Sequence, residues 1–437
     1  MDFATLPLTG RVRLENLVTP GCFGDGGDLV ATALTLEDGR IADGPAPRAV
    51  DMKGALLMPC GVDMHTHLDK GHIWPRAANA DGTFMGALST VQKDRAAHWS
   101  AEDVRRRMDF SLRCAWAHGT RAIRTHLDSI PPQPEISWPV FDQVRADWAG
   151  RIDLQAACLV GFDRLDRGGP FPGIADMVAR HGGVLGAVTL PVPDITQRLD
   201  FFFELAGARG LDADFHADET MDPGCNTLRA IAEAVLRTGF DRPVVVGHCC
   251  SLSTQDAKSA LETLDLVAEA GVSIVSLPMC NLYLQDRHAN RTPRGRGITL
   301  VHEAAARGIE VAFASDNTRD PFYAYGDMDM LEVMREATRI GHLDHSHDRW
   351  PRAFSATPAE ICGFAPANAP GAAADFVIYN ARSWTELFAR PQADRIVVRN
   401  GVQIDRTLPD YAELDDLMEE TWQPTSPVRK QPLPIST

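Results

Sequence analysis

Residues 59–67 read Pro-Cys-Gly-Val-Asp-Met-His-Thr-His. His65 and His67 are two residues apart, and side chains at this spacing point to the same side of an extended chain. The apolar run 55–58 before them is typical of a buried strand. The sequence therefore predicts a pair of imidazoles at the end of a strand, where they form a natural chelate for a divalent metal. Two solvated loop histidines are the alternative.

Short apolar segments typical of strands continue through the middle of the chain. Seven further segments alternate there with helix-like segments such as 101–118 and 227–238. Eight strands separated by helices predict an α/β fold, a (β/α)8 TIM-type barrel. The seven segments are 122–125, 154–159, 186–188, 213–216, 244–247, 273–276 and 310–314.

Both ends of the chain are rich in short strands, and Asp38-Gly39 and Asn400-Gly401 separate such strands at the spacing of tight hairpin turns. We therefore expect a small β-sandwich domain formed from both termini, residues 1–57 and 368–415. The catalytic barrel is expected over 58–367. Residues 416–437 are expected to form a C-terminal tail, which is rich in proline.

The composition excludes several classes of partner. The chain has 437 residues with 43 Lys+Arg against 59 Asp+Glu, a net charge of −16, so no global positive field exists to attract nucleic acid. No run of 18 apolar residues and no secretory pattern are seen, so no membrane association is expected. Nine cysteines without regular spacing indicate reduced thiols and a cytoplasmic location.

Four of the eight predicted strands end in a histidine or an aspartate. The histidine pair follows the first strand, His216 the fifth, His248 the sixth and Asp316 the eighth. The carboxyl ends of barrel strands meet at one face, which is the catalytic face. A single aspartate after a strand is usually a helix cap, but the four positions together favour a metal site.

These strand ends resemble those of the amidohydrolase superfamily: H-T-H, H-A-D-E, G-H and S-D-N, after strands one, five, six and eight. Residues 281–287, 294–298, 316–322 and 124–128 resemble bacterial cytosine deaminase more specifically. The resemblance covers nearly the whole chain. It implies a hydrolase of pyrimidine metabolism that acts on C–N bonds of cyclic amidines. Hydroxide formed at a metal would attack the amino-bearing carbon of cytosine, or of a related pyrimidine, purine or triazine, and release ammonia.

The resemblance also implies that His65, His67, His216 and Asp316 bind one divalent metal ion, Zn²⁺ or Fe²⁺. Neutral imidazoles and one carboxylate suit either ion and leave a position for water, whose pKa the metal lowers. The end of the fourth strand, residues 186–191, contains no lysine that could hold a second ion. A single metal is therefore expected.

Three residues receive catalytic roles from the resemblance. Glu219 would be the proton shuttle that donates to a ring nitrogen, with a first-turn helix carboxylate as the alternative. His248 would orient the hydroxide or stabilise the tetrahedral adduct, with a buried core histidine as the alternative. Asp316 would take the proton from water. Asp218 and Asp222 fit the role of a first-turn helix carboxylate better than Glu219 does.

The expected substrate contacts depart from those of cytosine deaminase. The family's substrate-reading glutamine aligns near Gly161, and Asn317 stands where an aspartate is typical. An amide both donates and accepts, so it can serve a different hydrogen-bonding edge. The roles of Lys70, His72 and His126 are left open. The candidate substrate-binding residues are Gly161, Phe162, Gln285, Asn317 and Phe322.

The sequence leaves two alternatives to a deaminase. Ser315-Asp316-Asn317 and His67-x-Asp-Lys also resemble N-alkyl amino-triazine amidohydrolases, which release an alkylamine, although Glu219 favours a deaminase. A catalytically silent metal-binding barrel would need a missing ligand or proton shuttle. The expected partner is a small heterocyclic substrate, and the resemblance also implies homo-oligomers.

Overall fold

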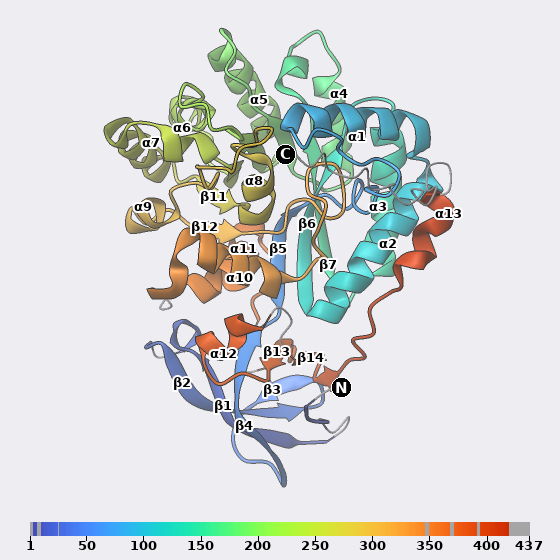
Figure 1. Ribbon diagram of the computed structural model, residues 1–437, viewed down its shortest axis with the longest axis vertical. Coiled ribbons are helices and arrows are strands. Elements are labelled where there is room, and N and C mark those ends of the chain that lie inside the picture. Colours follow the sequence, from blue (N-terminus) through green and yellow to red (C-terminus); the bar gives the residue numbers. More distant parts are fainter. Residues whose placement is uncertain are drawn as a thin grey trace, which may run out of the picture.

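The computed structural model describes residues 3–6, 10–24, 26–345, 349–367, 371–390 and 394–418. A barrel of alternating strands and helices stands on a β-sheet to which both ends of the chain contribute (Figure 1). Among the described residues, no helix is long and apolar enough to cross a membrane.

Eight parallel strands of the described chain form the barrel. Strands β5–β7 pair in one sheet and β8–β12 in another. Backbone bridges between Ala157 and Val184 and between Gly161 and Val188 join β7 to β8, and a bridge between Thr66 and Asp316 joins the two outer ends. These bridges close the ring. The strands are β5 (Gly61–Thr66), β6 (Thr120–Asp128), β7 (Asp153–Leu159), β8 (Leu185–Val188), β9 (Ala213–Ala217), β10 (Val244–His248), β11 (Ser273–Ser276) and β12 (Val311–Phe313).

Most of the helices surround these strands (Figure 1). Helix α2 shows why they form where they do: the side chain of Ser100 accepts from the Asp103 N–H at its start, and Gly119 ends it in the left-handed region at φ +93°. The helices are α1 (Phe84–His98), α2 (Ala101–His118), α3 (Pro134–Asp147), α4 (Phe171–Arg180), α5 (Ile195–Arg209), α6 (Thr227–Thr238), α7 (Ala257–Glu269), α8 (Pro278–Leu284), α9 (Val301–Ala306), α10 (Met330–Gly341), α11 (Ala356–Cys362), α12 (Trp384–Ala389) and α13 (Asp415–Met418).

A seven-stranded sheet unites the two ends of the chain in the order β15-β14-β13-β4-β1-β2-β3. Strand β4 pairs with β1 on one side and with β13 on the other, so it lies where the two ends meet. The predicted turns at 38–39 and 400–401 are confirmed, each with two residues in the left-handed region. The strands are β1 (Val12–Pro20), β2 (Leu29–Glu37), β3 (Arg40–Ala42), β4 (Arg48–Pro59), β13 (Phe376–Tyr379), β14 (Arg395–Arg399) and β15 (Val402–Gln403).

The predicted fold class is confirmed, but the expectation that residues 55–58 form the first barrel strand is wrong. They are the end of β4 in the terminal sheet, and the first barrel strand, β5, begins at Gly61. Cys60 separates the two runs, and its N–H donates to the carbonyl of Asp375. Both runs are apolar and extended, so periodicity does not distinguish their sheets. Most of the predicted tail, residues 419–437, lies outside the described residues.

Candidate active site

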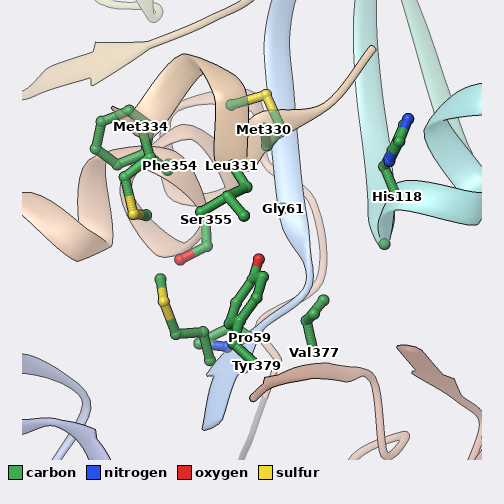
Figure 2. A pocket seen from close by; sticks show the side chains of 12 residues that line it. Pro59, Gly61, His118, Met330, Leu331, Met334, Phe354, Ser355, Val377 and Tyr379 are labelled. Carbon is green, nitrogen blue, oxygen red and sulfur yellow. The ribbon is translucent and has the colours of Figure 1, made fainter. Parts of the chain in front are cut away.

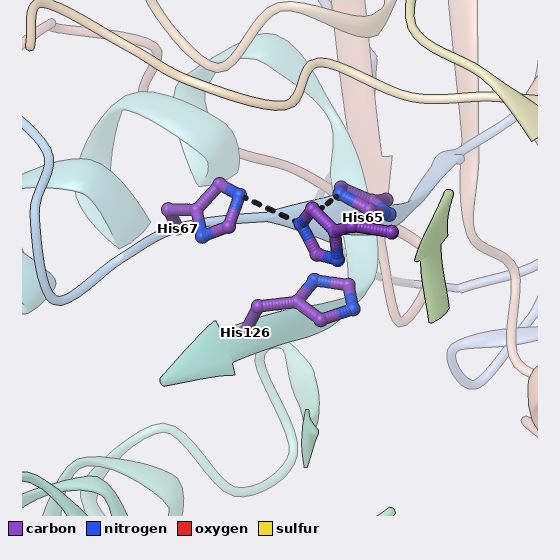
Figure 3. Close-up of side chains that lie close together, drawn as sticks. His65, His67 and His126 are labelled. Carbon is purple, nitrogen blue, oxygen red and sulfur yellow. Dashed lines mark hydrogen bonds between the residues drawn. The ribbon is translucent and has the colours of Figure 1, made fainter. Parts of the chain in front are cut away.

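The candidate metal ligands meet at the carboxyl ends of three barrel strands, β5, β9 and β12. The Nε2 atom of His216 lies 3.1 Å from Nε2 of His65 and 3.5 Å from Nε2 of His67. Oδ1 of Asp316 lies 3.1 Å from Nε2 of His67 and 3.7 Å from Nε2 of His65. Figure 3 shows His65 and His67 with His126 beside them. Residues more than 100 positions apart thus present four donor atoms to one point.

The spacing and chemistry of this cluster fit one divalent cation. Four ligands at zinc–ligand bonds of about 2.1 Å in tetrahedral geometry lie about 3.4 Å from one another, close to the distances observed. Burial lowers the pKa of all three histidines well below its usual value, so their rings are neutral and can donate a lone pair. Among the described residues, neither carboxylate oxygen of Asp316 has a hydrogen-bond partner, although the residue is buried.

Backbone contacts hold Asp316 against β5. Its N–H donates to the carbonyl of His65 at 2.9 Å, and the hydroxyl of Thr66 donates to its carbonyl at 2.7 Å. The preceding Ser315 donates its N–H and its hydroxyl to the buried carboxylate of Asp63, at 3.1 and 2.5 Å. Asp316 itself has φ +63°, a strained left-handed conformation. The fold therefore fixes this carboxylate beside the histidine pair.

Glu219 and His248 lie next to the candidate metal ligands. Oε1 of Glu219 is 3.5 Å from Nδ1 of His248. Burial, reinforced by the charge of Asp316, raises the pKa of Glu219 well above its usual value, so this carboxyl can hold a proton at neutral pH. Burial lowers the pKa of His248 to about 3, so its ring is neutral. The amide nitrogen of Asn281 lies 3.0 Å from Nδ1 of His248, which places the ring proton on Nε2.

The neighbouring Asp218 has a structural role. Its carboxylate accepts hydrogen bonds from the N–H groups of Thr227 and Leu228, at 2.7 and 3.0 Å, and from the side chains of Thr227 and Cys225. These N–H groups begin α6, so Asp218 satisfies the start of that helix. Glu219 is eight residues before α6, which excludes the alternative of a first-turn helix carboxylate.

The predicted substrate-binding residues lie in different surroundings. The side chain of Gln285 donates to the carbonyl of Glu219 at 3.2 Å, and Asn317 donates to Asp320 at 2.7 Å. Phe322 packs edge-on against Phe84, with ring centroids 5.5 Å apart. The remaining pair, Gly161 and Phe162, follows β7; Phe162 is fully buried and belongs to the apolar core.

The structure resolves the surroundings of Lys70, His126 and His72. Lys70 pairs with Asp128 at 3.0 Å and lies 5.6 Å from the centroid of the Phe322 ring. The ring of His126 lies 4.0 Å from that of His65, and its Nε2 is 3.2 Å from Asp214. His72 packs edge-on against Phe110.

The sequence did not lead us to predict the row of polar side chains on β6 that faces the inside of the barrel. Arg124, His126 and Asp128 alternate along β6, and the guanidinium of Arg124 lies 2.9 Å from the buried carboxylate of Asp214. Polar residues at every second position of a strand share one face. That alternation is the signal from which the row could have been predicted.

The pocket in Figure 2 lies elsewhere, between the terminal sheet and the barrel. Its lining contains none of the predicted site residues. The walls are mostly apolar and include Met58, Pro59, His118, Met330, Met334 and Tyr379.

Known proteins resemble the chain along most of its length. A sequence model described as the Amidohydrolase family matches residues 177–410. Pterin deaminase of Rhizobium rhizogenes strain K84 is 52% identical over 95% of this chain and 99% of its own. N-isopropylammelide isopropyl amidohydrolase of Pseudomonas sp. strain ADP is 24% identical over 82% and 88%. The structure of 5-methylcytosine deaminase from Klebsiella pneumoniae with 5-fluorocytosine is similar at a TM-score of 0.77, with 24% identity, over 91% of this chain and 98% of that one.

The chain therefore belongs to the amidohydrolase family. The family prediction made from the strand ends is confirmed, and the family is consistent with the metal-ligand cluster of histidines and an aspartate.

Proposed function

We propose that this protein is a pterin deaminase, which hydrolyses the bond between the 2-amino group of a 2-amino-4-oxopteridine and the ring and releases ammonia. The broader class, metal-dependent hydrolytic deamination of a nitrogen heterocycle, agrees with the relatives found. The observation that carries the proposal is the cluster of three Nε2 atoms and one carboxylate, beside which lies Glu219, a carboxyl whose pKa is raised well above its usual value. The substrate is proposed from the 52% identity to a pterin deaminase.

The residues of the site suit this reaction. When bound, a divalent cation lowers the pKa of a coordinated water and so supplies hydroxide near neutral pH. Glu219 donates its proton to the ring nitrogen beside the amino-bearing carbon, which prevents negative charge from building up on the ring. Nε2–H of His248 has no hydrogen-bond partner among the described residues, so it is free to donate to the oxygen that adds to this carbon. Asp316 accepts the proton that the attacking water loses.

Two positions support a larger substrate than cytosine. Pterin carries the same amino-amidine edge as a pyrimidine, but a second ring is fused to it. Gly161 has no side chain where the resemblance to cytosine deaminase expects a glutamine. Asn317 presents an amide in place of a carboxylate, and so offers a donor as well as an acceptor. We propose that these two positions, with Gln285 and Phe322, contact the bicyclic ring, whereas Phe162 belongs to the apolar core.

Ammonia release from purified, metal-loaded protein tests the proposal. We expect pterin to yield ammonia and the 2,4-dioxopteridine, with a kcat/KM at least ~10²-fold above that for cytosine, because an unmatched polar edge leaves buried groups unpaired. Isocytosine serves as the monocyclic control with the same amino-amidine edge. No ammonia from pterin would overturn the assignment. Release of isopropylamine from an N-isopropylamino-triazine would instead favour the amidohydrolase alternative.

We also propose that the site holds one ion per chain, Zn²⁺ or Fe²⁺. The end of β8 supports a single ion because it offers Thr189, whose hydroxyl lies 2.7 Å from that of Thr227, and no lysine. Elemental analysis of the purified protein distinguishes one ion from two and zinc from iron.

Three broader expectations stand as proposals. The division into residues 1–57 with 368–415, 58–367 and 416–437 is supported by the terminal sheet and the closed barrel, except that β4 of the terminal sheet continues to Pro59, so we propose the first boundary there. A cytoplasmic location is proposed from the cysteine pattern, and homo-oligomers from the family resemblance. Limited proteolysis, fractionation of the source cells and light scattering test them in turn.

A further inference from the structure

A cysteine thiol on α8 reaches the candidate active site. Cys280 lies on α8, directly after β11, and is fully buried. Its thiol lies 3.5 Å from the side-chain oxygen of Asn317 and 3.9 Å from the carbonyl of Phe322, and either oxygen can accept its one proton. It therefore sits among residues of the loop that carries Asp316. Neither the proposed reaction nor the histidine cluster uses this thiol.

The thiol also lies beside two carboxylates of the site. Cys280, Glu219 and Asp316 each offer one ligand atom, and these three atoms lie within 4.8 Å of one another. Asp316 is 1% exposed, and its two carboxylate oxygens have no hydrogen-bond partner among the described residues. One of its oxygens faces His67, so the carboxylate can bridge to a second ion through the other. A thiolate with two carboxylates is a donor set for zinc and for softer dications.

We propose that Cys280, Glu219 and Asp316 form a second, inhibitory site for a thiophilic divalent cation such as Cd²⁺ or excess Zn²⁺. The ion forms a bond to sulfur and displaces the thiol proton to solvent. It shares Asp316 with the histidine site, as in pairs of metals bridged by one carboxylate. It also occupies the carboxylate of Glu219, which then cannot protonate the ring. The inhibitory effect thus rests on the proposed role of Glu219, whereas the binding itself does not.

The site is tested by adding Cd²⁺ stepwise to protein that already holds one equivalent of metal. We expect the wild type to take up a second equivalent in equilibrium dialysis. An ultraviolet thiolate-to-cadmium charge-transfer band should rise with it, while ammonia release falls. Cys280→Ser keeps a hydroxyl donor for Asn317 but offers no thiolate. In this variant the band should be absent, the second equivalent should bind at least ~10-fold more weakly, and turnover should resist Cd²⁺.

Two control variants sharpen the result. Cys114→Ser removes a buried thiol on α2, outside the barrel strands, and should titrate like the wild type. Glu219→Gln should weaken the second equivalent and leave the first in place, which dialysis measures without any turnover.

Several outcomes would overturn the site. The first is that the wild type binds no second equivalent. The second is that the charge-transfer band persists in both Cys280→Ser and Cys280→Ala, and the third is full turnover with the second equivalent bound. Uptake and the band need no substrate, so a failure of the pterin assignment is distinguishable from a failure of the second site.

Discussion

Glu219 is a largely buried carboxyl beside the proposed metal ligands, where burial and the charge of Asp316 raise its pKa well above the usual value. Glu219→Gln preserves the shape and removes the transferable proton. We expect turnover to fall at least ~10²-fold, the range typical of a lost general acid, while the metal content is unchanged. Ammonia release and elemental analysis of the same preparation check both parts. A variant with wild-type turnover would show that another group protonates the ring.

His65 and Asp316 supply two of the four donor atoms at the proposed metal site. Replacing either by alanine leaves three donors and removes a ligand that the fold holds in place. We expect His65→Ala and Asp316→Ala each to lose most of the bound metal and the turnover with it. Metal per chain after dialysis is the measurement. Full metal and full activity in either variant would refute the proposed ligand set.

The start of α6 depends on one carboxylate. Asp218 accepts four hydrogen bonds there, two of them from the helix N–H groups of Thr227 and Leu228. Asp218→Ala leaves these buried donors unsatisfied, so we expect the free energy of unfolding to fall by about 1–3 kcal/mol. Asp222 is the matched control because it is exposed and accepts from nearby Gly224. Urea denaturation should show a clearly smaller loss for Asp222→Ala; equal losses would contradict the capping role.

A buried ion pair connects the terminal sheet to the barrel. Arg395 on β14 donates to both carboxylate oxygens of Asp329, at 2.8 and 2.6 Å, and Asp329 accepts from the N–H of Leu331 at the start of α10. The pair lies near the pocket of Figure 2, whose lining includes Met330 and Tyr379. Burial raises the pKa of Asp329, but the charge of Arg395 outweighs it and holds this pKa well below the usual range. The pair therefore stabilises the contact between the two parts while Asp329 is ionised.

This pair predicts a pH dependence of stability. Because the pKa of Asp329 is lower in the folded than in the unfolded chain, its contribution is fully present above about pH 4 and is lost as the pH falls below that value. Arg395→Met removes the guanidinium that balances this buried carboxylate, so we expect the free energy of unfolding at pH 7 to fall by about 3–5 kcal/mol. Urea denaturation at pH 7 and pH 3 should show this loss shrinking in acid, where Asp329 of the variant is protonated. A loss independent of pH would assign the effect to packing alone.

Features that depend on neighbouring residues were determined by the sequence itself. Helices α2 and α6 begin and end where their patterns and caps predict, at 101–118 and 227–238. The hairpin turns at 38–39 and 400–401 follow from residues that tolerate a positive φ. The approach of His216 and Asp316 to the histidine pair was predicted because both lie at the ends of apolar segments and barrel strands end at one face. The strand that carries the histidine pair was misplaced, since 55–58 belong to the terminal sheet.

Contacts between distant segments were decided only by the tertiary structure. Whether 55–58 belong to the barrel or to the terminal sheet depends on pairing with β13, more than 300 residues away. Three contacts arise only when the ring of strands closes. They are those of Lys70 with Asp128, of His126 with Asp214 and of Cys280 with Asp316. Periodicity and turn chemistry act over a few residues, whereas strand pairing and buried charge depend on which segments the closed barrel brings together.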